Sequence, residues 1–469
     1  MVFGALALLH IVVAAIVTGY ILVNKSDVRS AIGWIGLIWL SPFVGAAIYS
    51  AFGINRVARR ASRINRDPGP TIEFPEQSTF NTTELDVDIR PIADVGSRVT
   101  KLPLTQGNSI SMLRGDVQAY PEMLSSIANA RRSIALVTYI FRHDQVGSKF
   151  VAALIAARKR GVEVRVLIDG IGSGYIFSSV VRRLLSAGIP TTRFMHDWRP
   201  WRMSFVNLRN HKKLIVVDGT TGFAGGLNLG NENTWTRTRK REVDDIHFRV
   251  DGPVVGQLMI SFAEDWHFST GETLDGRAWW PIIRPKGGVI ARGVSSGPDE
   301  DVGSIETILA AALGQAKHDI RIVTPYFLPD EQLKSAIILA GLRGVRIELL
   351  IPERSDHVGM DWAMRAHLSF FPVERMKCFT TPKPFDHSKL LTVDGKWCAV
   401  GSPNWDVRSL RLNFEFLLEC YDEGTVATID ALIDEKISRA KPLTFACLSA
   451  RPLIARLRDA SARLFLPYL

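Results

Sequence analysis

Two segments of this chain carry the same pattern, and the second copy constrains the fold more than any other feature. Each reads His-x-Lys followed by four residues and Asp, over 211–218 in the first copy and 387–394 in the second. Each continues into a turn of small residues that holds an asparagine, Asn228 or Asn404. Repetition of the whole pattern predicts a duplicated domain, with one site built from both halves.

Each motif is expected to form the start of a β-strand. The apolar runs 214–217 and 390–393 are partly β-branched and end at an Asp-Gly turn signal. Side chains alternate along a strand, so a histidine and a lysine two positions apart lie on one face. The residues paired in this way are His211 with Lys213 and His387 with Lys389.

Two imidazoles, two ammonium groups and two amides suit the chemistry of a phosphodiester. Lysines neutralise phosphoryl oxygens, and asparagine amides donate hydrogen bonds to them. One imidazole can attack phosphorus while the other, protonated, donates to the departing alcohol. The sequence does not distinguish which of His211 and His387 is the nucleophile. The histidines lack a partner at helical spacing and no Cys pair lies nearby, so we expect no metal and no other cofactor.

The doubled motif resembles that of the phospholipase D superfamily. Further segments carry the resemblance through both halves: 139–141, Asp144 and 160–169 in the first, 324–327 and 343–350 in the second. The stretches 296–299 and 412–415 are similar to bacterial cardiolipin synthases in particular. The resemblance implies a fold of two phospholipase D-like α/β sandwich halves.

The resemblance also implies roles for individual residues. The catalytic set would be His211, Lys213, Asp218, His387, Lys389 and Asp394, supported by Asn228, Asn404, Asp245 and Glu415. Asp245 and Glu415 stand where the family carries an acid, and each would accept the ring N–H of its own half's histidine. Asp244 competes with Asp245 for that role, and Asp386 is expected to raise the pKa of His387. Asp218 and Asp394 end their strands at turns, where a scaffolding role is expected.

By this resemblance, the expected activity is transfer of a phosphatidyl group between two phosphatidylglycerol molecules. The products would be cardiolipin and glycerol, formed through a phosphatidyl-histidine intermediate. The alternatives are a phospholipase D that hydrolyses phospholipids to phosphatidic acid, and a phosphodiesterase acting on nucleic acid. The net charge of +10 fits a polyanionic partner of either kind. Phosphatidylglycerol, other anionic phospholipids and a bilayer are the expected partners, and nucleic acid is not expected.

The amino-terminal region is predicted to be a transmembrane helical hairpin. Residues 2–23 and 31–53 are apolar stretches of about the 20 residues that cross a bilayer. Five arginines follow the second stretch: Arg56, Arg59, Arg60, Arg63 and Arg66. By the positive-inside rule they lie in the cytoplasm, together with the catalytic region. The expected location is therefore the cell membrane.

The chain is expected to divide into four parts. These are the hairpin with its arginine-rich end (1–66), a proline-rich linker or loosely packed lead-in (67–106), and the two halves (107–285 and 286–469). Within each half, strands alternate with helices ended by glycine, the pattern of an α/β sheet.

Overall fold

The structure is a computed structural model that describes most of the chain. The described residues are 2–25, 28–50, 78–174, 177–196, 208–234, 243–297, 303–371 and 376–464. The chain divides into two compact units, Met1–Ile64 (unit 1) and Asn65–Leu469 (unit 2). The predicted arginine cluster of 56–66 and the first part of the predicted linker, 67–77, lie outside the described residues.

Unit 1 consists of apolar helices. They are α1 (Val2–Asn24), α2 (Val28–Leu40) and α3 (Pro42–Ile48). Ala14, Ile21 and Ile38 form part of the small core where the helices pack. The second predicted span is therefore two short helices rather than one, because Pro42 lacks an N–H and is tolerated only in the first turn of a helix.

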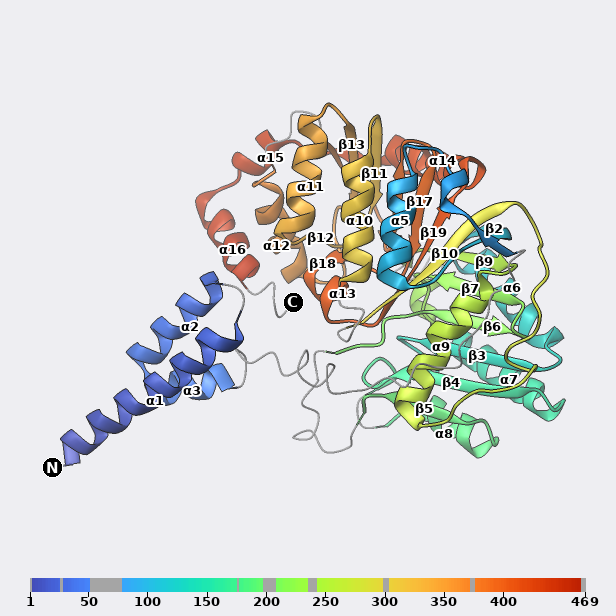
Figure 1. Cartoon of the computed structure of the whole chain (residues 1–469), viewed down its shortest axis with the longest axis horizontal. Helices are drawn as coiled ribbons and strands as arrows, with labels where there is room; N and C mark the ends of the chain where they lie inside the picture. The colour runs from blue at the N-terminus through green and yellow to red at the C-terminus, as the bar shows by residue number, and fades with distance from the viewer. Residues whose placement is uncertain are drawn as a thin grey trace. The chain divides into compact units, whose positions relative to one another are not determined.

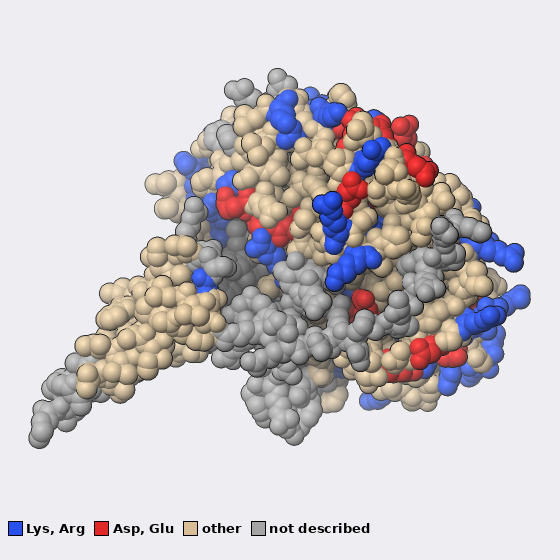
Figure 2. Space-filling model, in the orientation of Figure 1, with Lys and Arg blue, Asp and Glu red and all other residues tan. Residues whose placement is uncertain are grey.

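The surface of unit 1 is almost free of charge on the face seen in Figure 2. Aliphatic side chains such as Leu22 and Ile16 are largely exposed. No helix in the described part of the chain has both the length and the hydropathy needed to cross a membrane.

Unit 2 is built on one continuous sheet of sixteen strands among the described residues, arranged as two matching halves (Figure 1). The first half contains β2 (Leu104–Arg114), β3 (Ser133–Thr138), β4 (Glu163–Asp169), β5 (Thr191–Phe194), β6 (Leu214–Val217), β7 (Thr221–Gly225) and β9 (Ile246–Asp251). The second contains β10 (Val289–Ser296), β11 (Asp319–Val323), β13 (Arg346–Pro352), β14 (Met376–Thr381), β16 (Leu390–Val393), β17 (Trp397–Gly401) and β19 (Glu415–Tyr421). The strands β1 (Thr79–Phe80) and β20 (Lys441–Pro442) pair with β2 and β14.

The strand order proves the duplication. It runs β5-β4-β3-β6-β7-β9-β2 in the first half and β14-β13-β11-β16-β17-β19-β10 in the second. The halves join edge to edge where β2 and β10 pair antiparallel. In each half the motif strand, β6 or β16, lies antiparallel to a central strand, β3 or β11.

Helices cover both faces of the sheet. In the first half they are α6 (Gly115–Asn129), α7 (Gln145–Lys159), α8 (Ser179–Ser186) and α9 (Val255–Thr270). In the second they are α10 (Ser304–Gln315), α11 (Glu331–Leu342), α12 (Val358–Leu368), α13 (Val407–Arg411) and α14 (Glu423–Arg439). One core, containing Phe262 of α9 and Ile429 of α14, has members from both halves. Alternate residues of β6 enter different cores, Val216 this one and Ile215 that of α6 to α8, as the period of a strand requires.

The prediction of a linker or loosely packed lead-in over 67–106 is wrong for its described portion. Residues Arg90–Thr100 form α5, which packs against α10. Ile92 and Ala93 are fully buried there. The prolines that suggested a linker include Pro91, which occupies the first turn of α5, where a missing N–H is tolerated.

Candidate active site

The predicted histidines and lysines lie in the segments just before the two motif strands, β6 and β16. His211 and Lys213 immediately precede β6, and Lys213 Nζ donates to the His211 carbonyl oxygen at 2.6 Å. Lys389 Nζ makes the same contact with the His387 carbonyl oxygen. Each lysine is therefore tied to the backbone of its own histidine, and all four side chains are buried or nearly so.

Each histidine is held by a carboxylate from the opposite half. His211 Nδ1 lies 3.0 Å from both carboxylate oxygens of Glu415, and His387 Nδ1 lies 2.6 Å from Asp245 Oδ2. The prediction that each acid serves the histidine of its own half is therefore wrong. Of the two adjacent acids, Asp245 contacts a histidine, His387, and Asp244 contacts Lys436 instead.

Backbone pairing between the halves explains the exchange of partners. His211 N–H donates to the carbonyl of Phe414, the residue before Glu415, at 2.8 Å. His387 N–H donates to the carbonyl of Asp244, the residue before Asp245, at 2.7 Å. In the second case two short parallel strands form, β15 (Phe385–Asp386) and β8 (Val243–Asp244). Each motif thus runs beside the acid-bearing segment of the other half.

The two acids have different surroundings. Glu415 also accepts from Ser402 Oγ and Ser409 Oγ, each at 2.5 Å. At the position equivalent to Ser402, the first half has Gly226, where a Cβ atom would clash with the Asp245 carboxylate. Neither serine was predicted as a site residue. Ser402 lies within the turn before Asn404, and no sequence pattern marks Ser409.

Electrostatics keep the acids ionised and the imidazoles neutral. Burial raises the pKa of Glu415, but His211 and Lys213 outweigh it and hold that pKa at about 2. Burial lowers the pKa of His211 to about 4, although Glu415 opposes the shift. Burial, followed by Lys389, also lowers the pKa of His387. A neutral imidazole has the free lone pair that a nucleophile needs.

The two motifs act on one another electrostatically, as expected for one shared site. Lys389 lowers the pKa of His211, and Lys213 lowers the pKa of His387. Burial lowers the pKa of Lys213 to about 7, and the charge of Lys389 contributes to that shift. Two ammonium groups that repel each other in this way favour an anion between them.

Both asparagines lie in the buried region with unused hydrogen-bonding capacity. Asn228 and Asn404 are 8% and 7% exposed, and the Oδ1 atom of each has no hydrogen-bond partner among the described residues. Their backbones are fixed, because the Asn228 carbonyl accepts from Tyr120 Oη at 2.6 Å and Asn404 N–H donates to Ser409 Oγ at 2.8 Å. Each unused oxygen can accept a hydrogen bond from a hydroxyl group of a bound ligand.

Two tyrosines complete the surroundings of the histidines. The Tyr139 ring lies edge-on to His211 with 5.0 Å between centroids, and Lys213 Nζ lies 5.4 Å from the Tyr139 centroid. The ring centroids of Tyr326 and His387 lie 6.4 Å apart, and the Tyr326 hydroxyl donates a hydrogen bond to Asp356. Both tyrosines lie in the repeated segments 139–141 and 324–327, for which no role was predicted.

Asp218 and Asp394 belong to the motif but not to its reactive end. Seven residues of extended chain, about 23 Å, separate Asp218 from His211. The Asp218 carboxylate accepts the backbone N–H groups of 131–133 at 2.7–3.1 Å, and that of Asp394 accepts those of 317–319 at 2.7–2.8 Å. Both residues have positive φ, 53° and 51°. They hold the starts of β3 and β11 in place, as expected for a scaffolding role, and these contacts do not support the prediction that they belong to the catalytic set.

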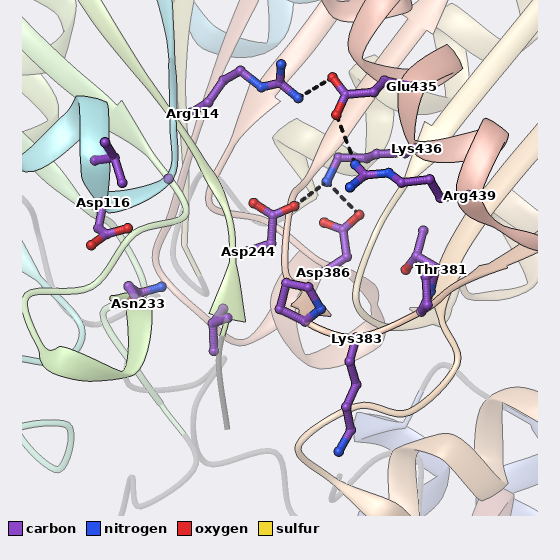
Figure 3. A pocket seen from close by; sticks show the side chains of 15 residues that line it. Arg114, Asp116, Asn233, Asp244, Thr381, Lys383, Asp386, Glu435, Lys436 and Arg439 are labelled. Carbon is purple, nitrogen blue, oxygen red and sulfur yellow. Dashed lines mark hydrogen bonds and ion pairs between the residues drawn. The ribbon is translucent and has the colours of Figure 1, made fainter. Parts of the chain in front are cut away.

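The side chains of Asp244 and Asp386 both contact a buried lysine and not a histidine. Lys436 Nζ of α14 lies 2.9 Å from Asp244 Oδ2 and 2.8 Å from Asp386 Oδ2 (Figure 3). The predicted effect of Asp386 is wrong, since the pKa of His387 is lowered and Asp386 is not among its causes. The three side chains line a cavity of about 400 Å³ together with residues of both halves.

Among the described residues, no three His, Cys, Asp or Glu side chains are grouped so as to hold a metal ion. The groups that surround the site are the imidazoles of His211 and His387, the ammonium groups of Lys213 and Lys389, and the amides of Asn228 and Asn404. This set can stabilise a tetrahedral phosphorus centre and exchange the oxygen substituents on it.

Comparisons with known proteins agree with this geometry. Residues 123–266 and 309–437 match a family described as "Cardiolipin synthase, PLD-like domain". The chain is 30% identical to cardiolipin synthase 1 of Bacillus anthracis over 96% of this chain and 91% of that protein. It is 29% identical to the major cardiolipin synthase ClsA of Bacillus subtilis, over 98% of both chains. Phosphatidylserine synthase of Haemophilus influenzae shares the fold, with a TM-score of 0.64 and 15% identity over 81% of this chain and all of that one.

Proposed function

The chain belongs to the cardiolipin synthase family with phospholipase D-like domains, and we propose that it transfers a phosphatidyl group from one phosphatidylglycerol molecule to another. The products are cardiolipin and glycerol. The observation that carries this proposal is the pair of buried histidines, each held by a carboxylate of the opposite half. A two-step exchange at phosphorus requires such a pair.

In the first step one imidazole attacks the phosphorus of phosphatidylglycerol through Nε2. The bond from phosphorus to the glycerol oxygen breaks. The other imidazole, protonated once the phosphate anion is bound beside it, donates its Nε2 proton to the glycerol oxygen and becomes neutral. A phosphatidyl-histidine remains. In the second step a terminal hydroxyl of another phosphatidylglycerol loses its proton to the second imidazole and attacks the same phosphorus. The histidine leaves, and the enzyme returns to its starting state.

The remaining residues have supporting roles in this scheme. Lys213 and Lys389 balance the charge of the phosphoryl oxygens, and the amides of Asn228 and Asn404 donate to those oxygens. Glu415 and Asp245 fix the ring orientation and tautomer of the histidines and stabilise the imidazolium forms. One phosphodiester replaces another, so the bond types are conserved and no nucleotide is consumed.

We further propose that unit 1 holds the enzyme at the cell membrane, with unit 2 on the cytoplasmic side. Its exposed aliphatic side chains and nearly uncharged surface support contact with lipid. The arginines of 56–66 support the orientation, because basic residues that flank apolar segments stay in the cytoplasm.

Mass spectrometry of the lipids and alcohol released from phosphatidylglycerol vesicles tests the proposed function. The wild type should form cardiolipin and glycerol, and both His211→Ala and His387→Ala should lose this activity. His318→Ala, which removes an exposed imidazole of the same unit, is the control and should remain active. Phosphatidic acid in place of cardiolipin would identify a hydrolase. Absence of any phospholipid turnover would overturn the proposal and favour a nucleic-acid substrate.

A further inference from the structure

Near the carboxyl end, α16 (Leu453–Leu464) packs with its apolar side chains outward. Leu453, Ile454, Leu457 and Leu464 are 67%, 83%, 59% and 75% exposed, whereas Asp459 is only 2% exposed. A surface helix of a globular protein normally shows the reverse arrangement. Four large aliphatic side chains on one helix form an exposed apolar face, and such a face indicates contact with another molecule or a membrane.

Specific contacts fix this orientation. Asp459 pairs with Arg451 and with Arg458, the latter at 2.8 Å, so its buried charge is neutralised. The Arg458 guanidinium lies 4.4 Å from the Trp362 ring of α12, and that of Arg463 lies 4.2 Å from the Phe370 ring. The cation–π contacts hold the inner face of α16 on α12 and turn the aliphatic face outward.

The two helices run in the same direction, and α12 connects α16 to the surroundings of His387. Arg458 reaches Trp362 and the later Arg463 reaches the later Phe370. At the start of α12, Asp356 accepts the hydroxyl hydrogen bond of Tyr326, whose ring faces His387. Val358, the first residue of α12, is 58% exposed and extends the apolar surface.

We propose that the outward face of α16, together with Val358, lies against the surface of an anionic phospholipid bilayer. Arg456 is exposed beside the aliphatic residues, Arg458 keeps 42% of its side chain exposed, and Asp459, the one acid of the helix, is turned inward. Aliphatic residues with flanking arginines bind the interface of an anionic membrane. Two copies of the chain that met through this face would bring like positive charges together, which disfavours such a contact. The contact would place the catalytic edge toward the lipid that contains the substrate.

Cysteine labelling of the full chain measures the contact directly. Ile454→Cys, in a Cys447→Ser background that removes the exposed native thiol, is treated with a membrane-impermeant maleimide. In vesicles containing phosphatidylglycerol, labelling should be about tenfold slower than in detergent micelles. Leu342→Cys on α11, 78% exposed in the native chain, is the matched control and should label equally in both. Equal rates for Ile454→Cys, or shielding in detergent that grows with protein concentration, would overturn the proposal, the latter in favour of a second copy.

Turnover gives a second readout that separates docking from chemistry. The double variant Ile454→Asp/Leu457→Asp should lose about tenfold in turnover of long-chain phosphatidylglycerol in vesicles. Its turnover of a short-chain phosphatidylglycerol dissolved as monomers should equal that of the wild type. Leu339→Asp/Leu342→Asp is the control with matched chemistry. Vesicle activity equal to wild type would contradict the proposal, whereas an inactive wild type with protected Ile454→Cys would contradict only the proposed function.

Discussion

Two histidine–carboxylate pairs form the centre of the site, His211 with Glu415 and His387 with Asp245, and each pair joins residues of opposite halves. Sequence reasoning identified all four residues, because each half repeats them in the same order. It assigned the partners within each half, since spacing along the chain does not reveal which half lies opposite. The partnership depends on tertiary contacts, here the backbone pairing that precedes each histidine.

The histidine–carboxylate pairs predict the effect of neutralising each acid. Glu415→Gln and Asp245→Asn should each lower kcat by about a hundredfold or more with little change in KM, because the amide no longer stabilises imidazolium. Steady-state kinetics on phosphatidylglycerol measures both constants. Glu353→Gln, the same change at a half-exposed carboxylate, should leave kcat unaltered. If either acid variant kept full kcat, that histidine would not need its carboxylate.

The lowered histidine pKa values predict how activity depends on pH. A base whose pKa is lowered stays neutral in more acidic solution, so attack should fail only as pH falls through about 4, the pKa of His211, rather than through about 6.5. The acid limb of kcat/KM, measured between pH 4 and 8, should therefore lie well below 6.5. Assays returned to pH 7 distinguish this limb from irreversible unfolding. An acid limb near pH 6.5, the ordinary pKa of histidine, would show that burial does not lower the pKa of the reacting imidazole.

At the scale of elements, the two halves stabilise the same arrangement with opposite charges. On either side of His211, Asn210 and Lys212 contact Asp265 of α9, with Lys212 Nζ 2.9 Å from its carboxylate. Before His387, Asp386 contacts Lys436 of α14. Strands and helices could be predicted from the repeated pattern, down to the limits of β6 and β16. These pairings could not, because only the fold brings the helix to the strand.

Removing Lys436 should loosen the segment that carries His387. Lys436→Met leaves the carboxylates of Asp244 and Asp386 without their cation and should lower the free energy of unfolding by about 3 kcal/mol. The added change Asp386→Asn, which copies Asn210 of the first half, should restore part of that loss. Chemical denaturation of the single and double variants measures both effects. A second substitution that gave no recovery would show that the two residues contribute independently.

The strand-end aspartates should matter for stability and not for chemistry. Asp394→Ala removes the acceptor of three backbone N–H groups and puts alanine at positive φ, so it should lower the free energy of unfolding by about 2 kcal/mol. Below the unfolding temperature, kcat should remain near that of the wild type. Thermal unfolding and kcat are measured on the same preparation. A large fall in kcat in a fully folded variant would restore Asp394 to the catalytic set.

At the scale of the molecule, the duplication was evident from sequence and the start of unit 2 was not. Buried Arg292 contacts Glu419 at 2.5 Å, Ser97 Oγ at 2.6 Å and the Ala93 carbonyl at 3.0 Å, so it joins α5 to both β10 and β19. The prolines and polar residues before position 107 resemble a linker when read alone. The burial of Ile92 and Ala93 in α5 follows from long-range contacts with α10 and Arg292, which local composition does not report.

Two deletions test where the catalytic unit begins. Removing residues 1–77 keeps α5 and should leave a cooperatively folding protein that turns over soluble short-chain phosphatidylglycerol. Removing residues 1–106, the boundary expected from sequence, takes away α5 and most of the hydrogen-bond partners of Arg292. A buried charge that loses partners costs several kcal/mol, in addition to the exposed apolar surface of α10. The longer deletion should therefore fail to fold, as seen by circular dichroism and size-exclusion chromatography. A soluble and active 107–469 fragment would show that α5 is dispensable and that the sequence-based boundary is the functional one.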